Sequence, residues 1–159
     1  MSLNTEAEAL GKMTMFRGVD PAKLKLLAFA SERVEFAPGE AVCRQGDPPD
    51  AAFFILEGSV RVSRDAGSGP MPLGMLQAGT IVGDTCILGA DQRMATVEAA
   101  TPVSALRIEK AAFCDLLKED AKLSFAVSCE FARRLDQLSL QAAQRLSGMT
   151  PAQGEPRNG

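Results

Sequence analysis

The sequence predicts a mainly β fold of about eight strands, an antiparallel sandwich, jelly roll or barrel, flanked by helices. Between Glu32 and Glu109, short β-type runs are separated by Gly, Pro and Asp. Before and after this region, apolar residues recur at helical spacing. Strands do not alternate with helices, as they would in a parallel sheet. The 159 residues, 46% of them hydrophobic, can form one domain with a proper core.

Three short elements are expected before the strands. Residues 4–10 indicate a modest helix, and residues 12–16 form a short apolar-rich piece. The next helix has a clearer start, because Asp20 suits an N-cap and Pro21 suits the first helical position. It should continue to about Ser31 and pack against the region of strands after it.

The central region contains eight runs that suit strands. They cover residues 34–36, 41–44, 53–56, 60–62, 73–76, 80–82, 95–99 and 103–108. Four glycines lie where strands must turn, and turn geometry accounts for Gly39, Gly46, Gly58 and Gly79. Gly83 differs from these four, because it lies between a strand and a possible helical turn.

Helical spacing returns after the strands. Residues 111–118 predict a short helix, and residues 123 to about 146 predict a long one. An apolar seam of near-heptad spacing runs along the long helix through Phe131, Leu135, Leu138, Ala142 and Leu146. Further apolar residues lie off this seam, namely Phe125, Val127, Cys129 and Leu140. One side should pack on the strands, and the second apolar face favours a homodimer through residues 123–146. The alternative is a helix that only covers the strands.

Composition excludes several classes of function. The net charge of −3 and pI near 5.1 supply no basic field for nucleic acid or anionic lipid. No run approaches the ~20 apolar residues of a membrane span, and no signal peptide is recognisable, so we expect a cytoplasmic protein. The four scattered cysteines fit reduced thiols. The absence of histidine excludes His-based acid–base chemistry and leaves only Cys and carboxylates for a metal site, so we expect neither an enzyme nor a metal centre.

The stretch 81–97, IVGDTCILGADQRMATV, has the residues needed to hold a phosphate. Gly83 lets the backbone approach closely, and the amides of residues 85–87 would point outward from a helix start. Arg93 can add a charge-assisted fork, and Asp84 could accept from a sugar hydroxyl. The alternative interpretation is a glycine turn with a surface Asp/Arg ion pair.

Residues from about Phe16 to Leu146 resemble the cyclic nucleotide-binding domain family. The matching framework comprises Pro38-Gly39, Val42, Gln45-Gly46-Asp47, residues 53–56, Gly58, Val60, Val62, Leu76, Gly79 and residues 82–84. The family's phosphate-binding cassette reads F-G-E-x-A-L, followed after a short stretch by R-x-A-T. The corresponding residues here are VGDTCI at 82–87 and RMAT at 93–96.

The resemblance implies a double-stranded β-helix, or cupin-like jelly roll, over residues 16–147. Residues 1–15 would precede this domain as a helical extension. Residues 148–159 are rich in Gly and Pro with almost nothing to bury, so their composition predicts a flexible tail. The ligand would be a cyclic nucleotide, cAMP being favoured over cGMP, with Arg93 on the phosphate and the acidic residue on the ribose 2′-hydroxyl. The site residues implied are Val82, Gly83, Asp84, Thr85, Cys86, Arg93, Met94 and Ala95.

The resemblance also implies a regulatory sensor. Its long C-terminal helix would lie over the base, pair with its twin and signal to an effector protein. Two residues depart from the family: Asp84 is a methylene shorter than the usual Glu, and Met94 replaces a small residue. An alternative is therefore a degenerate module that binds proteins without nucleotide. An enzyme on a related roll, such as a cupin, would use a His-rich metal cluster, which this chain lacks.

Overall fold

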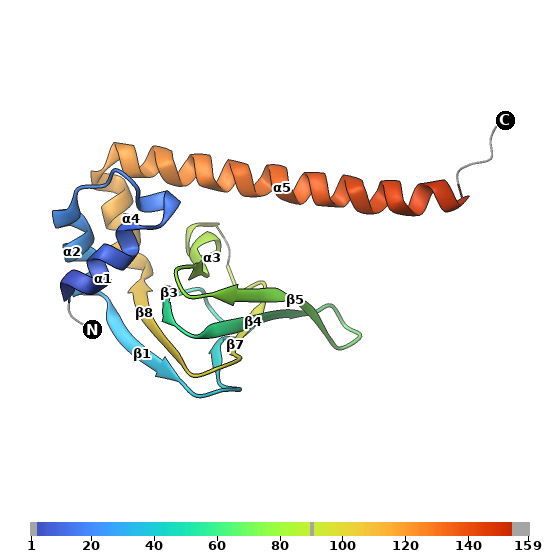
Figure 1. The fold of residues 1–159 in the computed structure, drawn as a ribbon, viewed down its shortest axis with the longest axis horizontal. Coiled ribbons are helices and arrows are strands. Elements are labelled where there is room, and N and C mark those ends of the chain that lie inside the picture. The colour runs from blue at the N-terminus through green and yellow to red at the C-terminus, as the bar shows by residue number, and fades with distance from the viewer. Residues whose placement is uncertain (1–2, 90, 154–159) are drawn as a thin grey trace.

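A computed structural model describes residues 3–89 and 91–153. Two four-stranded antiparallel sheets pack as a sandwich, with helices beside it and one long C-terminal helix that projects past the strands (Figure 1). The predicted fold class, mainly β with flanking helices, is confirmed.

Each of the eight predicted runs forms a strand. They are β1 (Glu32–Phe36), β2 (Ala41–Cys43), β3 (Ala51–Glu57), β4 (Ser59–Asp65), β5 (Pro70–Gln77), β6 (Ile81–Val82), β7 (Thr96–Ala99) and β8 (Val103–Glu109). One sheet has the order β1-β8-β3-β6, and the other has the order β2-β7-β4-β5. Because β6 and β7 belong to different sheets, the segment between them spans one end of the sandwich.

The helices before the strands follow the predicted signals. They are α1 (Leu3–Gly11), the 3₁₀ turn η1 (Thr14–Phe16) and α2 (Pro21–Ala30). Asp20 caps α2, since its side chain accepts from the amide of Ala22 at 2.9 Å. Later helices are α3 (Asp84–Gly89), α4 (Lys110–Glu119) and α5 (Ala121–Gln153).

Strand β3 is buried on both faces, which explains its uninterrupted apolar run from Ala51 to Leu56. Phe53 and Ile55 point into the sandwich core that is shared with β4, β7 and β8. Phe54 and Leu56 point the other way, into a second core formed with the N-terminal helices, α4 and α5. Strand β3 therefore joins the helical layer to the sandwich.

Helix α5 packs on the molecule only along its first part. Leu123 and Val127 are buried in the helical core, and Phe131 packs against it. Val127, predicted to lie off the apolar seam, is thus a core residue. The seam residues Leu135, Leu138 and Leu146 are 62–65% exposed. The helix also continues to Gln153, past the predicted end near Leu146.

The predicted tail begins inside α5, and residues 154–159 lie outside the described part of the chain. Within the described residues, no helix is long and apolar enough to cross a membrane.

Candidate functional site

The turn between β6 and α3 places Gly83 at the end of the sandwich. Its φ of +81° lies in the left-handed region that favours glycine. A Cβ on this residue would overlap Nη1 of Arg93, whose guanidinium lies against the turn. Gly83 therefore serves both the backbone conformation and the close approach of Arg93.

Arg93 is buried, with only 3% of the residue exposed. Its Nη2 atom donates to the carbonyl of Ala51 at 2.6 Å and lies 3.4 Å from Oδ1 of Asp50. The guanidinium also lies 5.9 Å from the ring centre of Phe53. Nη1, in contrast, has no hydrogen-bond partner among the described residues. Since a buried charged donor without a partner is costly, this nitrogen is suited to an acceptor supplied from outside.

The Gln45-Gly46-Asp47 turn holds the backbone of Arg93. The amide of Gly46 donates to the Arg93 carbonyl at 2.9 Å, and the Arg93 amide donates to the Asp47 carbonyl at 2.8 Å. The amide of Gln45 donates to Oγ1 of Thr96 at 2.9 Å. Because the turn clamps both sides of the RMAT segment, the position of Arg93 is fixed by backbone as well as by side chain.

A cavity of about 270 Å³ opens beside the Gly83 turn. It is lined by Cys43, Val62, Leu76, Ile81, Val82, Gly83, Asp84, Arg93, Met94, Ala95 and Val97. Six of the predicted site residues are therefore together: Val82, Gly83, Asp84, Arg93, Met94 and Ala95. Thr85 and Cys86 lie in the first turn of α3, and their side chains are outside the described part of the structure. Met94 is 44% exposed.

Five lining residues were not among the predicted site residues. Ile81 precedes the predicted cassette on β6, and the others come from β2, β4, β5 and β7, namely Cys43, Val62, Leu76 and Val97. Val62, Leu76 and Cys43 pack against the sandwich core, and Val97 belongs to it. Alternation along the strands was the available signal, since it marks inward-facing residues, but it does not say which of them line a cavity.

Asp84 is the second buried charge at the site, and its side chain is 4% exposed. Its Oδ2 atom accepts from Nη1 of Arg134 on α5 at 3.0 Å. The alternative sequence interpretation, a surface ion pair between Asp84 and Arg93, is therefore wrong. Both residues are buried, and Arg93 is paired with Asp50 while Asp84 is paired with Arg134.

Glu130 orients Arg134, the arginine that pairs with Asp84. Its carboxylate accepts from Nε of Arg134 at 3.2 Å and from Nη2 of Arg133 at 2.7 Å. These bonds, Arg133 first, hold the pKa of Glu130 below its ordinary value. Glu130 therefore stays ionised at neutral pH and fixes the direction of Arg134.

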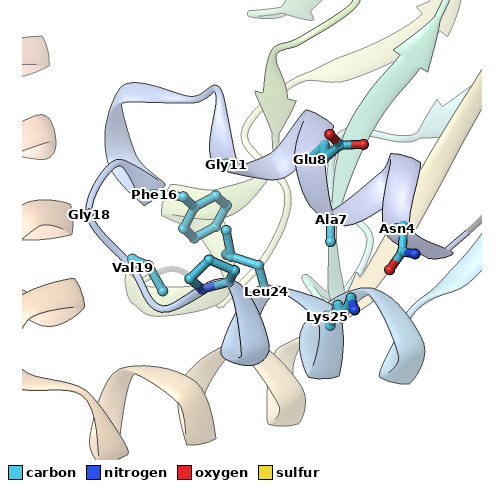
Figure 2. A pocket seen from close by; sticks show the side chains of 10 residues that line it. Asn4, Ala7, Glu8, Gly11, Phe16, Gly18, Val19, Leu24 and Lys25 are labelled. Carbon is cyan, nitrogen blue, oxygen red and sulfur yellow. The ribbon is translucent and has the colours of Figure 1, made fainter.

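A larger cavity, of about 490 Å³, lies between α1, η1 and α2 (Figure 2). Phe16, Val19 and Leu24 contribute apolar surface to it, while Glu8 and Lys25 lie around it. Among the described residues, none of the buried polar atoms without a partner belongs to this cavity. The cavity beside the Gly83 turn and Arg93 is therefore the better candidate for a ligand.

Residues 33–120, more than half of the chain, match the family described as cyclic nucleotide-binding domain. The cyclic nucleotide-gated potassium channel mll3241 of Mesorhizobium japonicum is 34% identical over 106 residues, which make up 67% of this chain and 28% of the channel. The chain thus spans less than a third of the length of that relative.

Two solved structures have the same fold. The sensor domain of the transcriptional regulator DNR from Pseudomonas aeruginosa aligns with a TM-score of 0.78 and 23% identity, over 85% of this chain and 91% of that one. The regulatory domain of Toxoplasma gondii PKA with cAMP aligns with a TM-score of 0.72 and 22% identity, over 82% of this chain and 50% of that one. At these identities the likeness concerns the fold alone.

Proposed function

Since the chain belongs to the cyclic nucleotide-binding domain family, we propose that it is a sensor whose Gly83 turn and Arg93 hold the phosphate of a cyclic nucleotide. The observation that carries this proposal is Nη1 of Arg93, a buried cationic donor that no described residue satisfies. A phosphate oxygen beside Gly83 would accept from it, and arginine binds phosphate through this kind of charge-assisted bond. The phosphate of the ligand would thus supply the hydrogen-bond acceptor that Nη1 of Arg93 lacks among the described residues.

The ribose is assigned to Asp84, whose carboxylate lines the same cavity. A 2′-hydroxyl can donate to a carboxylate oxygen, and a carboxylate has room for several donors. The rest of the lining is mainly apolar, with Val62, Leu76 and Val97. These side chains offer hydrophobic contact to a base but no hydrogen bond, and guanine would leave more polar groups unpaired there than adenine, so we favour cAMP over cGMP.

The signal would leave the site through α5. This helix is tied to the cassette by Arg134, and it carries exposed apolar residues beyond that point. We assign these to a homodimer contact, because two helices that bury such a seam against each other remove it from water. The effector would be another protein. We propose a cytoplasmic binding module and assign it no catalysis.

A second candidate function is an interaction module without nucleotide. It is favoured by the ion pair between Asp84 and Arg134, which already engages the carboxylate assigned to the ribose. Met94 at the edge of the cavity adds bulk where the family has a small residue.

Isothermal titration calorimetry with cAMP and cGMP separates the two candidates. The sensor function predicts saturable heat with cAMP that is lost in Arg93→Ala. No heat with either nucleotide at millimolar concentration would favour the interaction module.

A further inference from the structure

Helix α2 is apolar on more sides than the fold covers. Its sequence, PAKLKLLAFA, contains only two polar residues, both lysines. A helix that is apolar all round is expected to be covered all round. The core covers one side of α2, but Leu26 and Phe29 on the other side are 68% and 76% exposed. Because residues three apart are neighbours on a helix surface, these two form one apolar patch that the described residues leave uncovered.

A groove of about 280 Å³ runs beside this patch, between α2 and α4, which lie side by side in Figure 1. Leu26, Leu27 and Ala30 form its wall on α2, and Ala112 and Leu116 form the apolar part of its wall on α4. Residues four apart lie on one face of a helix, so each wall continues over a full turn. The groove can therefore accept a row of apolar side chains from a partner helix.

The unpaired charges at the rim of the groove are acidic. Asp115 and Glu119 line it from α4 and are exposed, and neither forms an ion pair with another described residue. The rim lysine, Lys23, is matched by Asp120 at 3.1 Å. Lys118, in the last turn of α4, does not line the groove. Two negative charges therefore remain there to attract lysine or arginine side chains of a partner.

We propose that the α2–α4 groove docks a basic amphipathic helix of another protein. The apolar face of that helix would lie between Leu26 and Leu116, and its lysines or arginines would pair with Asp115 and Glu119. Apolar burial would supply most of the affinity, and the charges would select the partner. The inference rests on the proposed function for the existence of an effector, and it adds the chemistry of the effector's docking segment.

A second copy of this chain fits the groove less well. Its exposed apolar helix surface is residues 135–146 of α5, where Asp136 and Arg145 are the only charged residues and cancel each other. That surface offers no basic flank to the acidic rim. The charge of the groove thus favours a different protein as the partner.

Fluorescence anisotropy with labelled peptides and the whole chain, without nucleotide, tests the docking. The first peptide, of about 18 residues, carries leucine at every third or fourth position and lysine beside that stripe. A second peptide carries glutamate in place of lysine, and a third has the composition of the first in scrambled order. We expect saturable binding of the lysine peptide, about tenfold tighter than binding of the glutamate peptide. Equal affinities for these two, or equally tight binding of the scrambled peptide, would overturn the proposal.

Leu26→Ser/Phe29→Ser should weaken binding of the lysine peptide by about tenfold, because the apolar anchors are lost. Phe125→Ser/Leu140→Ser is the matched control, since these α5 residues are 72% and 60% exposed and do not line the groove. It should leave the affinity unchanged. An equal loss in both variants, or no loss in the α2 variant, would place the peptide elsewhere and contradict the proposal.

Asp115→Asn/Glu119→Gln should bring the affinities for the lysine and glutamate peptides to within about twofold of each other, because the rim charges are removed. Asp136→Asn, which removes an exposed carboxylate on α5, should keep the full preference for lysine. A preference that survives in Asp115→Asn/Glu119→Gln would refute the role of the rim.

Two further measurements separate the possible outcomes. If calorimetry shows that cAMP binds but the peptides are not distinguished, only the docking inference fails. If the lysine peptide binds selectively but no nucleotide does, the sensor function fails and the docking surface stands. In sedimentation, a dimer that survives Leu138→Glu but is lost in Leu26→Ser/Phe29→Ser would assign the groove to a second copy of the chain and overturn the proposal.

Discussion

Nη1 of Arg93 lies so close to Gly83 that a methyl group on the glycine would be only 2.4 Å from it and would overlap it. This relationship explains why the two residues belong to one site, although β6 and the RMAT segment are separated by α3. Because of this close approach, ligand binding should be sensitive to a substitution of Gly83 that alters no charged residue.

Gly83→Ala should weaken binding of cAMP, because the new Cβ displaces the guanidinium. Gly79→Ala is the control, since Gly79 has a similar φ of +90° and open space around it. Both variants should lose about 1–2 kcal/mol of stability from backbone strain in thermal unfolding. Only Gly83→Ala should lose affinity in calorimetry, and equal losses of affinity would refute the close-approach argument.

Arg93→Met should abolish binding while the domain stays folded. The loss of stability should be modest, because the charge on the unpartnered Nη1 no longer has to be desolvated, and Asp50, which is 65% exposed, keeps its pair with Arg107 once the guanidinium of Arg93 is gone. We expect the melting temperature to change by no more than a few degrees, on the order of 1 kcal/mol. Calorimetry measures the binding of cAMP, and circular dichroism measures folding and the melting temperature. Binding of cAMP that survives in a folded Arg93→Met protein would contradict the phosphate assignment.

The stability of the protein should depend on pH through Asp120, which directly precedes α5. The amide of Leu123 and then the ammonium of Lys23, both at 3.1 Å, hold the pKa of Asp120 below its ordinary value of 3.8. A carboxyl whose folded pKa is lowered stabilises the protein fully above the unfolded pKa, and this stabilisation is lost as the pH falls through the folded pKa. Asp120→Ala should therefore melt below wild type at neutral pH, and the difference should shrink below pH 3.8.

The control for this pH dependence is Asp136→Ala, which removes an exposed carboxylate farther along α5. Its melting temperature should follow that of wild type at each pH. A difference between Asp120→Ala and wild type that stays constant down to the acid limit would rule out the proposed role of the Asp120 carboxylate.

Leu138→Glu should convert the proposed dimer into a monomer, because a charge on the exposed seam of α5 opposes burial of that seam. Phe125→Glu is a suitable control, since Phe125 is 72% exposed and lies off the seam. Analytical ultracentrifugation provides the measurement. A wild-type protein that sediments as a monomer, or a dimer that tolerates Leu138→Glu, would exclude this interface.

Much of this fold could be predicted from the sequence because its signals are local. Alternation and turn residues marked the eight strands, and the cap at Asp20 marked the start of α2. The cassette residues were found for the same reason, since Gly83, Asp84 and Arg93 are near one another in the chain. These features depend on neighbouring residues.

The partners of the two buried charges could not be predicted in this way. Asp50 and Arg134 are 43 and 50 positions from the residues that they pair with. Both appear in the sequence as ordinary charged residues, and only the packing of β3 and α5 brings them to the site. The buried role of Val127 was missed for a related reason, because α5 is apolar on several sides and its spacing does not reveal which side meets the core.

The most direct test of the account is a crystal structure of the chain with cAMP. We predict electron density for the cyclic phosphate between Gly83 and Arg93, with Nη1 of Arg93 within hydrogen-bond distance of a phosphate oxygen. A structure at saturating cAMP with no density there, or with the nucleotide bound elsewhere, would contradict it.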